Sequence, residues 1–359
     1  RFPVVVGGRV GRDARATSLL TALVEGLGAA YVDDANVVAF PTAHPQNAGS
    51  DRSVIDEADV VLAVDLPNMA GTIGRLPMNS PGTGAAVIDL SLGDLGVRSW
   101  ANVFSAPQPR TVHLLADPLR GLRSLIDALP RHVAAAHRDD VLARVRSRVS
   151  GLRESRAARQ AAAWEDSPIS PARLVGELWA AVRDLPWLLV LRNTRSWPEG
   201  IWQFQGAGEY LGHSGGGGVG YGPGAMVGGA LAARDRGQLG VAIVGDGDLL
   251  MAPGALWTAV HYRIPMLVVV NDNQSFYNDD EHQVRVARAR HRPPENAWIG
   301  TGITDPAIDI AAIARSYGCW AAGPVTDPDA LGPALRDAAK EAAGGAVAVV
   351  HVRTSGERR

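Results

Sequence analysis

Two apolar segments that each end in a polar cluster constrain the fold of this chain more than any other feature. The first, Val241–Val244, ends in Gly-Asp-Gly at 245–247, and the second, Met266–Val270, ends in Asn-Asp-Asn at 271–273. The residues between them predict a helix over about Ala252–Arg263. Apolar runs rich in Val and Ile that are separated by a helix are typical of neighbouring buried parallel strands. Both polar clusters are therefore expected at one edge of a sheet, at the carboxyl ends of its strands, where open α/β folds bind ligands.

The residues of these clusters have the chemistry of a metal–diphosphate site. Asp246 and Asn273 offer oxygen ligands that suit Mg²⁺ or Ca²⁺ rather than zinc. Gly245 and Gly247 allow backbone N–H groups to approach an anion closely, and the dipole of the following helix favours negative charge there. The sequence therefore predicts a cation bound next to a cradle for phosphate groups.

The Gly-Asp-Gly sequence, the 24 residues after it and the closing Asp-Asn pair resemble the thiamine diphosphate (ThDP) motif of acetolactate synthase-like and 2-oxo acid decarboxylase enzymes. Asp272 replaces the family's usual first Asn, whereas the metal-binding second Asn is kept as Asn273. The resemblance implies that Mg²⁺ is bound by Asp246, Asn273 and the backbone carbonyl of Ser275. Asp248 is another departure, because the family usually has a small residue there. Its N–H is expected to bind the diphosphate, which its carboxylate would repel unless it turned away or paired with an Arg.

A glycine-rich segment at 213–223, with the sequence HSGGGGVGYGP, supports the same assignment. A disordered linker is the alternative, because a run of glycines is costly to order. The segment nevertheless passes directly into an apolar helix predicted over Ala225–Ala233 and then into the Gly-Asp-Gly strand. The resembling enzymes place this segment against the aminopyrimidine ring of ThDP. This implies that the Gly217 carbonyl accepts from the 4′-amino group, with Gly218 beside it, and that Val219 supports the bent cofactor with a smaller side chain than the family's usual Met or Leu.

Two further stretches hold candidate site residues. A strand predicted over Trp187–Leu191 is followed by Asn193 and Thr194, which would reach the diphosphate if this strand ended at the same edge. An ordinary polar turn is an equally open interpretation of these two residues. A polar stretch after the closing Asn supplies three candidates for proton transfer or substrate contact, for which solvated side chains are the alternative. They are Tyr277, Glu281 and His282.

The alternation of predicted strands and helices indicates an α/β protein with two doubly wound parallel-sheet domains. The first, residues 1–130, closes with a helix predicted to stop at Pro130 and is similar to the central domain of the ThDP family. That domain carries FAD in some members, so FAD is a second candidate cofactor. The turn at 7–11, Gly-Gly-Arg-Val-Gly, lacks the full dinucleotide-binding spacing and favours a tight strand-to-helix turn over a nucleotide-binding module. A connector follows at 131–166, and a ThDP diphosphate-binding domain is expected at 167–359.

The connector is rich in Arg and Ala and has one apolar helical stripe, formed by Val141, Leu142, Val145 and Val149. Acidic residues are interspersed among the Arg residues, which favours a solvated helix over a nucleic-acid-binding segment. The net charge of −2 likewise indicates neither nucleic acid nor an anionic membrane as a partner. A single cysteine, Cys319, excludes an internal disulfide, and no apolar span or signal peptide is evident. A cytoplasmic location is expected.

The resemblance implies decarboxylation or carboligation of a small 2-oxo acid. In that family the glutamate that activates ThDP belongs to a pyrimidine-binding domain, N-terminal to the central domain, and acts from the opposite subunit. The sequence opens at Arg1 where a central domain would begin. We therefore expect the activating Glu from a domain not in this chain, in a homodimer or homotetramer, and assign no catalytic acid here. A non-catalytic ThDP-binding or assembly subunit that stabilises a partner chain is the alternative.

Overall fold

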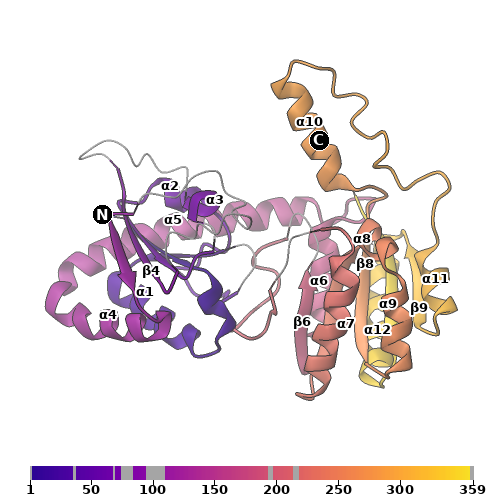
Figure 1. The fold of residues 1–359 in the computed structure, drawn as a ribbon, viewed down its shortest axis with the longest axis horizontal. Coiled ribbons are helices and arrows are strands. Elements are labelled where there is room, and N and C mark those ends of the chain that lie inside the picture. Colours follow the sequence, from indigo (N-terminus) through magenta and orange to yellow (C-terminus); the bar gives the residue numbers. More distant parts are fainter. Residues whose placement is uncertain are drawn as a thin grey trace. The chain divides into compact units, whose positions relative to one another are not determined.

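The computed structural model describes residues 2–34, 38–67, 69–73, 84–93, 110–192, 197–212 and 218–355. Contacts divide the chain into two compact units, Arg1–Ala158 with Gln203–Gly212, and Arg159–Trp202 with His213–Arg359. Each unit contains a five-stranded parallel sheet with flanking helices (Figure 1), which confirms the prediction of two doubly wound α/β domains.

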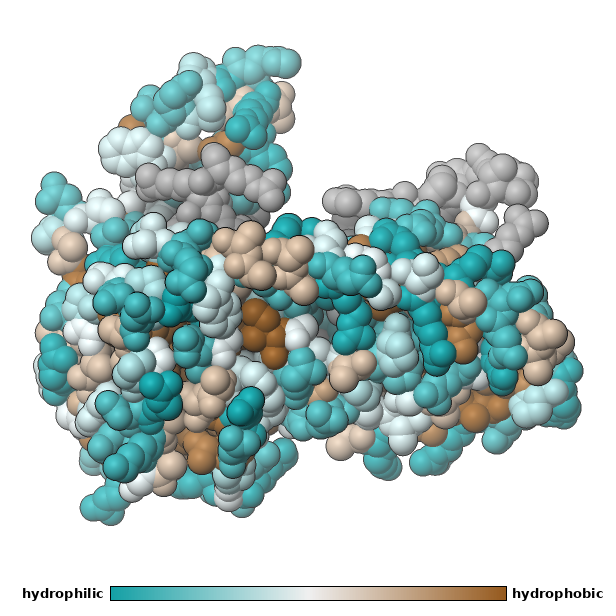
Figure 2. All heavy atoms as spheres, turned by 180° about the vertical axis from the view of Figure 1, so that it is seen from behind, coloured by the Kyte–Doolittle hydropathy of each residue, from teal (hydrophilic) through white to brown (hydrophobic). Residues whose placement is uncertain are grey.

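Among the residues that the structure describes, none of the helices combines the length and apolar character needed to cross a bilayer. The face shown in Figure 2 is mostly hydrophilic, with its apolar residues scattered. Isolated apolar residues of this kind are normal on protein surfaces.

The first unit has the strand order β2-β1-β3-β4-β5, with every neighbouring pair parallel. Its strands are β1 (Pro3–Gly7), β2 (Ala30–Asp33), β3 (Val60–Val64), β4 (Ala86–Ser91) and β5 (Val112–Leu115). Its helical elements are η1 (Arg9–Arg12), α1 (Ala16–Leu27), α2 (Ser53–Asp56), α3 (Met69–Ile73), α4 (Pro118–His132) and most of α5 (Ala135–Ala162). Two apolar clusters, one on each face of the sheet, form its core.

Helix α4 does not stop where the sequence predicts. Pro130 lies inside the helix, which continues to His132. The proline removes the hydrogen bond of one N–H, but the Val133 N–H still donates to the Leu129 carbonyl at 2.9 Å and closes the last turn. Arg131 and His132 in that turn also interact favourably with the negative end of the helix dipole.

Helix α5 covers one face of the first sheet. Val141, Val145 and Val149, three residues of the predicted stripe, are buried in the same apolar cluster as the β1 and β3 side chains. Further along the helix, Arg153 and Arg156 donate to loop carbonyls of the same unit, those of Thr42, His44 and Ala48. The part of α5 up to Ala158 is therefore packed as part of the first unit. The sequence suggests instead a solvated connector between two domains. An apolar stripe with an i, i+4 spacing is stable only against an apolar surface, and the sheet provides it.

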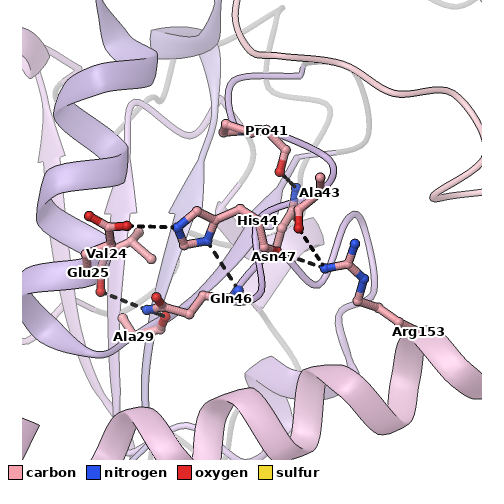
Figure 3. A network of polar contacts seen from close by, with 9 residues as sticks. All are labelled: Val24, Glu25, Ala29, Pro41, Ala43, His44, Gln46, Asn47 and Arg153. Atoms are coloured by element: carbon pink, nitrogen blue, oxygen red, sulfur yellow. Dashed lines mark hydrogen bonds and ion pairs between the residues drawn. The ribbon is translucent and has the colours of Figure 1, made fainter. Parts of the chain in front are cut away.

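The loop after β2 covers the edge of the first sheet through a network of polar contacts (Figure 3). The Gln46 side chain donates to the carbonyls of Val24, at 3.0 Å, and Ala29, at 2.8 Å. Arg153 of α5 donates to the carbonyl of His44 at 3.0 Å, and the Gln46 carbonyl accepts from the Tyr31 N–H of β2 at 2.8 Å. The last of these bonds occupies an N–H group of the edge strand that would otherwise be open to pairing with another chain, and the others fix the loop in place.

The second unit has the strand order β6-β7-β8-β10-β9, again all parallel. Its strands are β6 (Trp187–Arg192), β7 (Leu239–Gly245), β8 (Met266–Asp272), β9 (Trp320–Val325) and β10 (Val347–Arg353). Its helices are α6 (Pro171–Val182), α7 (Tyr221–Arg234), α8 (Asp246–Met251), α9 (Gly254–His261), α10 (Tyr277–Ala289), α11 (Ile310–Ser316) and α12 (Pro328–Ala343).

Local sequence signals account for several of these boundaries and miss others. Ser170 caps α6 by accepting from the Arg173 N–H at 3.2 Å, with Pro171 in the first helical position. The helix predicted over about Ala252–Arg263 corresponds to α9, and a further short helix that was not predicted, α8, begins at Asp246 directly after β7. Strand β9 and helix α10 lie where no strand or helix was predicted.

Candidate functional site

Strands β7 and β8 bring the two polar clusters together. The strands pair in parallel, with Gly245 opposite Asn271, so Asp246 and Asp272 follow at the same edge of the sheet. Figure 1 shows α8 at this end of the second sheet, next to β8. The side-by-side arrangement expected from the sequence is therefore present in the fold.

Asp246 is the most perturbed side chain of this edge. It is 2% exposed, and its Oδ2 atom is buried without a hydrogen-bond partner. Burial, together with the hydrogen bond and negative charge of Asp272, raises the pKa of Asp246 to about 8. A buried carboxylate oxygen with a free lone pair beside a second carboxylate is the environment that a bound cation would stabilise. The site therefore fits Mg²⁺.

Asn273 and Ser275 follow in a tight turn. Gln274, between them, has a positive φ of 61°, a left-handed conformation that reverses the chain. The Asn273 Oδ1 atom accepts from the Ser275 N–H at 3.1 Å, and the Ser275 hydroxyl donates to Asp280 of α10. The described residues hold no group of three His, Cys, Asp or Glu side chains suited to a metal. The predicted ligand set differs from such a group, since it combines one carboxylate, one amide and one backbone carbonyl.

Asp272, which departs from the family's Asn, is bound by two residues of β10. Its Oδ2 atom lies 2.6 Å from Nε2 of His351, which is fully buried, and 3.1 Å from Nη1 of Arg353. Desolvation would raise the pKa of Asp272, but the hydrogen bonds from His351 and Asp246 and the charge of Arg353 outweigh it, so the pKa is lowered. Asp272 is therefore the ionised member of the carboxylate pair.

Sequence reasoning missed His351 and Arg353. The available signal was a pair of polar residues, two positions apart, near the end of the otherwise apolar segment Val347–Arg353. Alternate residues of a strand share one face, and β10 lies directly beside β8, with Arg353 opposite Asp272. Only the strand order shows that these residues reach the site.

Asp248 turns away from the Gly-Asp-Gly backbone. Its Oδ1 atom accepts from the N–H of Gly220 at 2.5 Å and from that of Gly222 at 3.4 Å, at the start of α7. Because the Asp248 carboxylate turns away, it would not repel a diphosphate bound at this turn. This is the first of the two possibilities that the sequence left open, the other being an ion pair with an Arg.

The remaining candidates fall into two groups. Three of them, Asn193, Thr194 and Gly217, lie outside the described residues. Of the others in the glycine-rich segment, Gly218 has open space around its Cα, and Val219 is half exposed.

Tyr277, Glu281 and His282 lie on α10, which replaces the polar loop expected there and has no buried residue. His282 Nδ1 is 2.9 Å from a guanidinium nitrogen of Arg285. Tyr277 and Glu281 help to line a cavity of about 820 Å³ between α10 and the segment 294–298. The other lining residues are Asp280, Val284, Arg285, Arg288, Pro294, Glu295, Ala297 and Trp298.

Comparison with known proteins agrees with this geometry. Residues 193–352 match the family model of thiamine pyrophosphate enzymes, C-terminal TPP binding domain. A benzoylformate decarboxylase of Pseudomonas aeruginosa is 27% identical over 338 residues, covering 89% of this chain and 55% of that protein.

Two solved structures share the fold at 21% identity. The first is the thiamine diphosphate-dependent 4-hydroxybenzoylformate decarboxylase of Rhodococcus jostii RHA1, with a TM-score of 0.70. The alignment covers 100% of this chain and 62% of that enzyme's chain. The second is a putative thiamin diphosphate-dependent enzyme of Mycobacterium smegmatis, with a TM-score of 0.65. The alignment covers 99% of this chain and 62% of that enzyme's chain.

The second unit is thus a ThDP-binding α/β domain whose Gly-Asp-Gly turn and closing Asp-Asn pair lie at one sheet edge. The match to the TPP binding domain over residues 193–352 and the similarity to benzoylformate decarboxylase support the prediction that the chain is a member of the superfamily of ThDP-dependent 2-oxo acid decarboxylases. The chain spans about half the length of the curated relative it matches.

Proposed function

We propose that this chain supplies the diphosphate- and metal-binding part of the active site of a ThDP- and Mg²⁺-dependent enzyme that decarboxylates a 2-oxo acid. The observation that carries the proposal is the buried, unpartnered Oδ2 atom of Asp246, within the segment that matches the TPP binding domain. A bound cation would stabilise the ionised form of this carboxylate and would supply positive charge for a diphosphate.

The roles of the residues follow from their chemistry. Asp246, Asn273 and the Ser275 carbonyl would hold Mg²⁺, whereas the backbone N–H groups of residues 245–248 would bind the diphosphate. When bound, ThDP supplies the electron sink that allows a 2-oxo acid to lose CO₂. The protein's own contribution at this edge is to position the metal and the diphosphate and to keep the carboxylate pair dry.

The aromatic 2-oxo acids named for two of the relatives are the substrate class that we propose. The cavity beside α10 supports this choice, because it presents the aromatic rings of Tyr277 and Trp298 together with the guanidinium groups of Arg285 and Arg288. Rings of this kind can stack on an aryl group, and a guanidinium can bind a carboxylate in two places. Acetolactate synthase-like carboligation, a transferase reaction with pyruvate as donor, is the competing outcome.

We further propose that the activating Glu comes from a pyrimidine-binding domain outside this sequence, presented by a second subunit of a cytoplasmic homodimer or homotetramer. FAD in the first unit stays a prediction that the absorbance of the purified protein tests. The glycine-rich turn there has a packing reason of its own, since a Cβ on Gly8 would lie 2.3 Å from the Asp65 carbonyl oxygen.

Calorimetric titration of the chain with ThDP, in Mg²⁺ and then in EDTA, tests the proposal. We expect Mg²⁺-dependent binding that Asp246→Ala abolishes, and no CO₂ release from benzoylformate or pyruvate by this chain alone. Binding that survives both EDTA and Asp246→Ala would refute the metal site. Robust turnover of pyruvate by this chain alone would refute the need for a second domain. A chain that binds ThDP, yet leaves every 2-oxo acid unchanged when a pyrimidine-binding domain is supplied, would instead be a non-catalytic subunit.

A further inference from the structure

Asp248 joins two parts of the site that are 26 to 28 residues apart in the sequence. It is the third residue of α8, which begins at the Gly-Asp-Gly turn, and it is 8% exposed. Its carboxylate accepts from the N–H groups of Gly220 and Gly222, at the N-terminus of α7. The first N–H groups of a helix have no partner within the helix and need an acceptor from outside.

The contact is closely fitted, and glycine is required on both of its partners. Gly220 has a φ of 94°, which favours glycine, and provides no side-chain cap for α7. A Cβ on Gly222 would lie 2.1 Å from Oδ2 of Asp248 and 3.1 Å from Cδ2 of Leu191. The carboxylate thus occupies the space that a side chain on Gly222 would need, and it caps α7 from another helix. Its negative charge is also favoured by the dipole of the 14-residue helix.

We propose that Asp248 is a positioning residue that holds the segment Gly218–Gly222 at a fixed distance from the diphosphate-binding turn. The inference rests on the proposed function, in which this turn takes the diphosphate, and on the resemblance, which implies that the glycine-rich segment takes the aminopyrimidine end of ThDP. A single carboxylate then sets the spacing between the two ends of the cofactor site. Inorganic diphosphate, which has no ring, would be indifferent to that spacing.

Two ligands and three variants separate this role from general support of the fold. The dissociation constants of ThDP and of inorganic diphosphate, each with Mg²⁺, are measured for the full chain and for Asp248→Ala, Asp248→Asn and Asp235→Asn. Asp235 is the matched control, an exposed acid at the opposite end of α7. We expect Asp248→Ala to weaken ThDP by at least about tenfold, the equivalent of one charge-assisted hydrogen bond. The dissociation constant of inorganic diphosphate should change less than about twofold in Asp248→Ala. For ThDP, Asp248→Asn should bind with an affinity between those of the wild type and Asp248→Ala, and Asp235→Asn should match the wild type.

Native-state hydrogen exchange on the ligand-free protein gives a second readout. Peptides covering 218–226 should exchange faster in Asp248→Ala, whereas peptides from β7 and β8 should not. Equal loss of both ligands, or unchanged exchange at 218–226, would overturn the positioning role. If the wild type bound neither ligand, the proposed function itself would fail. The exchange result would still report separately whether Asp248 orders the segment.

Discussion

Gly240 tests how closely β7 and α7 must pack for the site to form. A Cβ built on Gly240 lies 2.7 Å from Cβ and 2.8 Å from Cα of Ala230, in the middle of α7. Ordinary carbon–carbon contacts are about 3.5–4.0 Å, so Gly240→Ala would force the helix to retreat by roughly 1 Å. The contacting atoms belong to the backbone and to a methyl group, and no flexible side chain can move aside.

The expected loss in the free energy of unfolding is about 2–3 kcal/mol, the upper part of the usual range for overpacking. Ala230→Gly alone should cost about 1 kcal/mol through helix propensity. The double variant removes the methyl contact but keeps the 2.8 Å contact with the Cα of residue 230, so it should recover only part of the Gly240→Ala loss. We expect a coupling of about 1 kcal/mol between the two sites. Gly228→Ala is the matched control, because Gly228 is exposed on the same helix and has nothing within 4 Å of its Cβ position. This variant should gain about 0.5–1 kcal/mol in the free energy of unfolding.

Urea unfolding followed by tryptophan fluorescence measures these changes in the second unit. Every Trp of the chain except Trp100 belongs to that unit, including the buried Trp202, whose ring lies 5.1 Å from that of Trp179. Additive losses in the Gly240→Ala/Ala230→Gly double variant would refute the claim that Ala230 sets the helix-to-strand distance. A Gly240→Ala protein as stable as the wild type would refute the packing argument altogether.

Three further predictions concern buried polar groups. His351→Met should cost about 1.5–3 kcal/mol more in urea unfolding than His351→Gln, because only Gln keeps a donor for Asp272; equal stability would show that this hydrogen bond contributes nothing. Asp246→Asn should abolish Mg²⁺-dependent ThDP binding. At pH 9, above the Asp246 pKa of about 8, it should also raise the melting temperature of the metal-free protein by about 2–4 °C, since both carboxylates of the wild type are then ionised and repel each other. A lower melting temperature of the variant in calorimetry at pH 9 would contradict this. Burial raises the pKa of the Cys319 thiol to about 11, so the free energy of unfolding should fall as the pH rises from the ordinary thiol pKa through 11. The buried thiol should also be unreactive: intact-mass analysis at pH 8 should find iodoacetamide adducts on the unfolded protein but not on the native protein.

Much of the fold could be predicted because its signals are local. The buried strands β7 and β8 are recognisable from continuous apolar runs, and α6 from a serine followed by a proline. Helix α10 and strand β9 were missed for opposite reasons. Helix α10 has no buried face and hence no apolar stripe, and β9 has the sequence WAAGPV, whose small residues and proline resemble a loop. In β9 the pairing with β10, rather than the sequence pattern of β9 itself, decides the structure. The signal available for α10 was the charge order of its ends, with Asp279 and Asp280 in the first turn and Arg288 in the last.

The sequence by itself determined the class of site. The residue types at 245–247 and 272–273 have a metal–diphosphate chemistry wherever they are brought together, and two consecutive parallel strands bring them together. Only the tertiary structure decided how the two unusual acids are accommodated. Asp272 is bound by His351, 79 residues away, because β10 is inserted between β8 and β9, and Asp248 caps a helix that precedes it by a whole strand. Residue spacing contains no information on strand order or on which backbone N–H groups lack a partner, and these two properties of the folded chain determine where each carboxylate is bound.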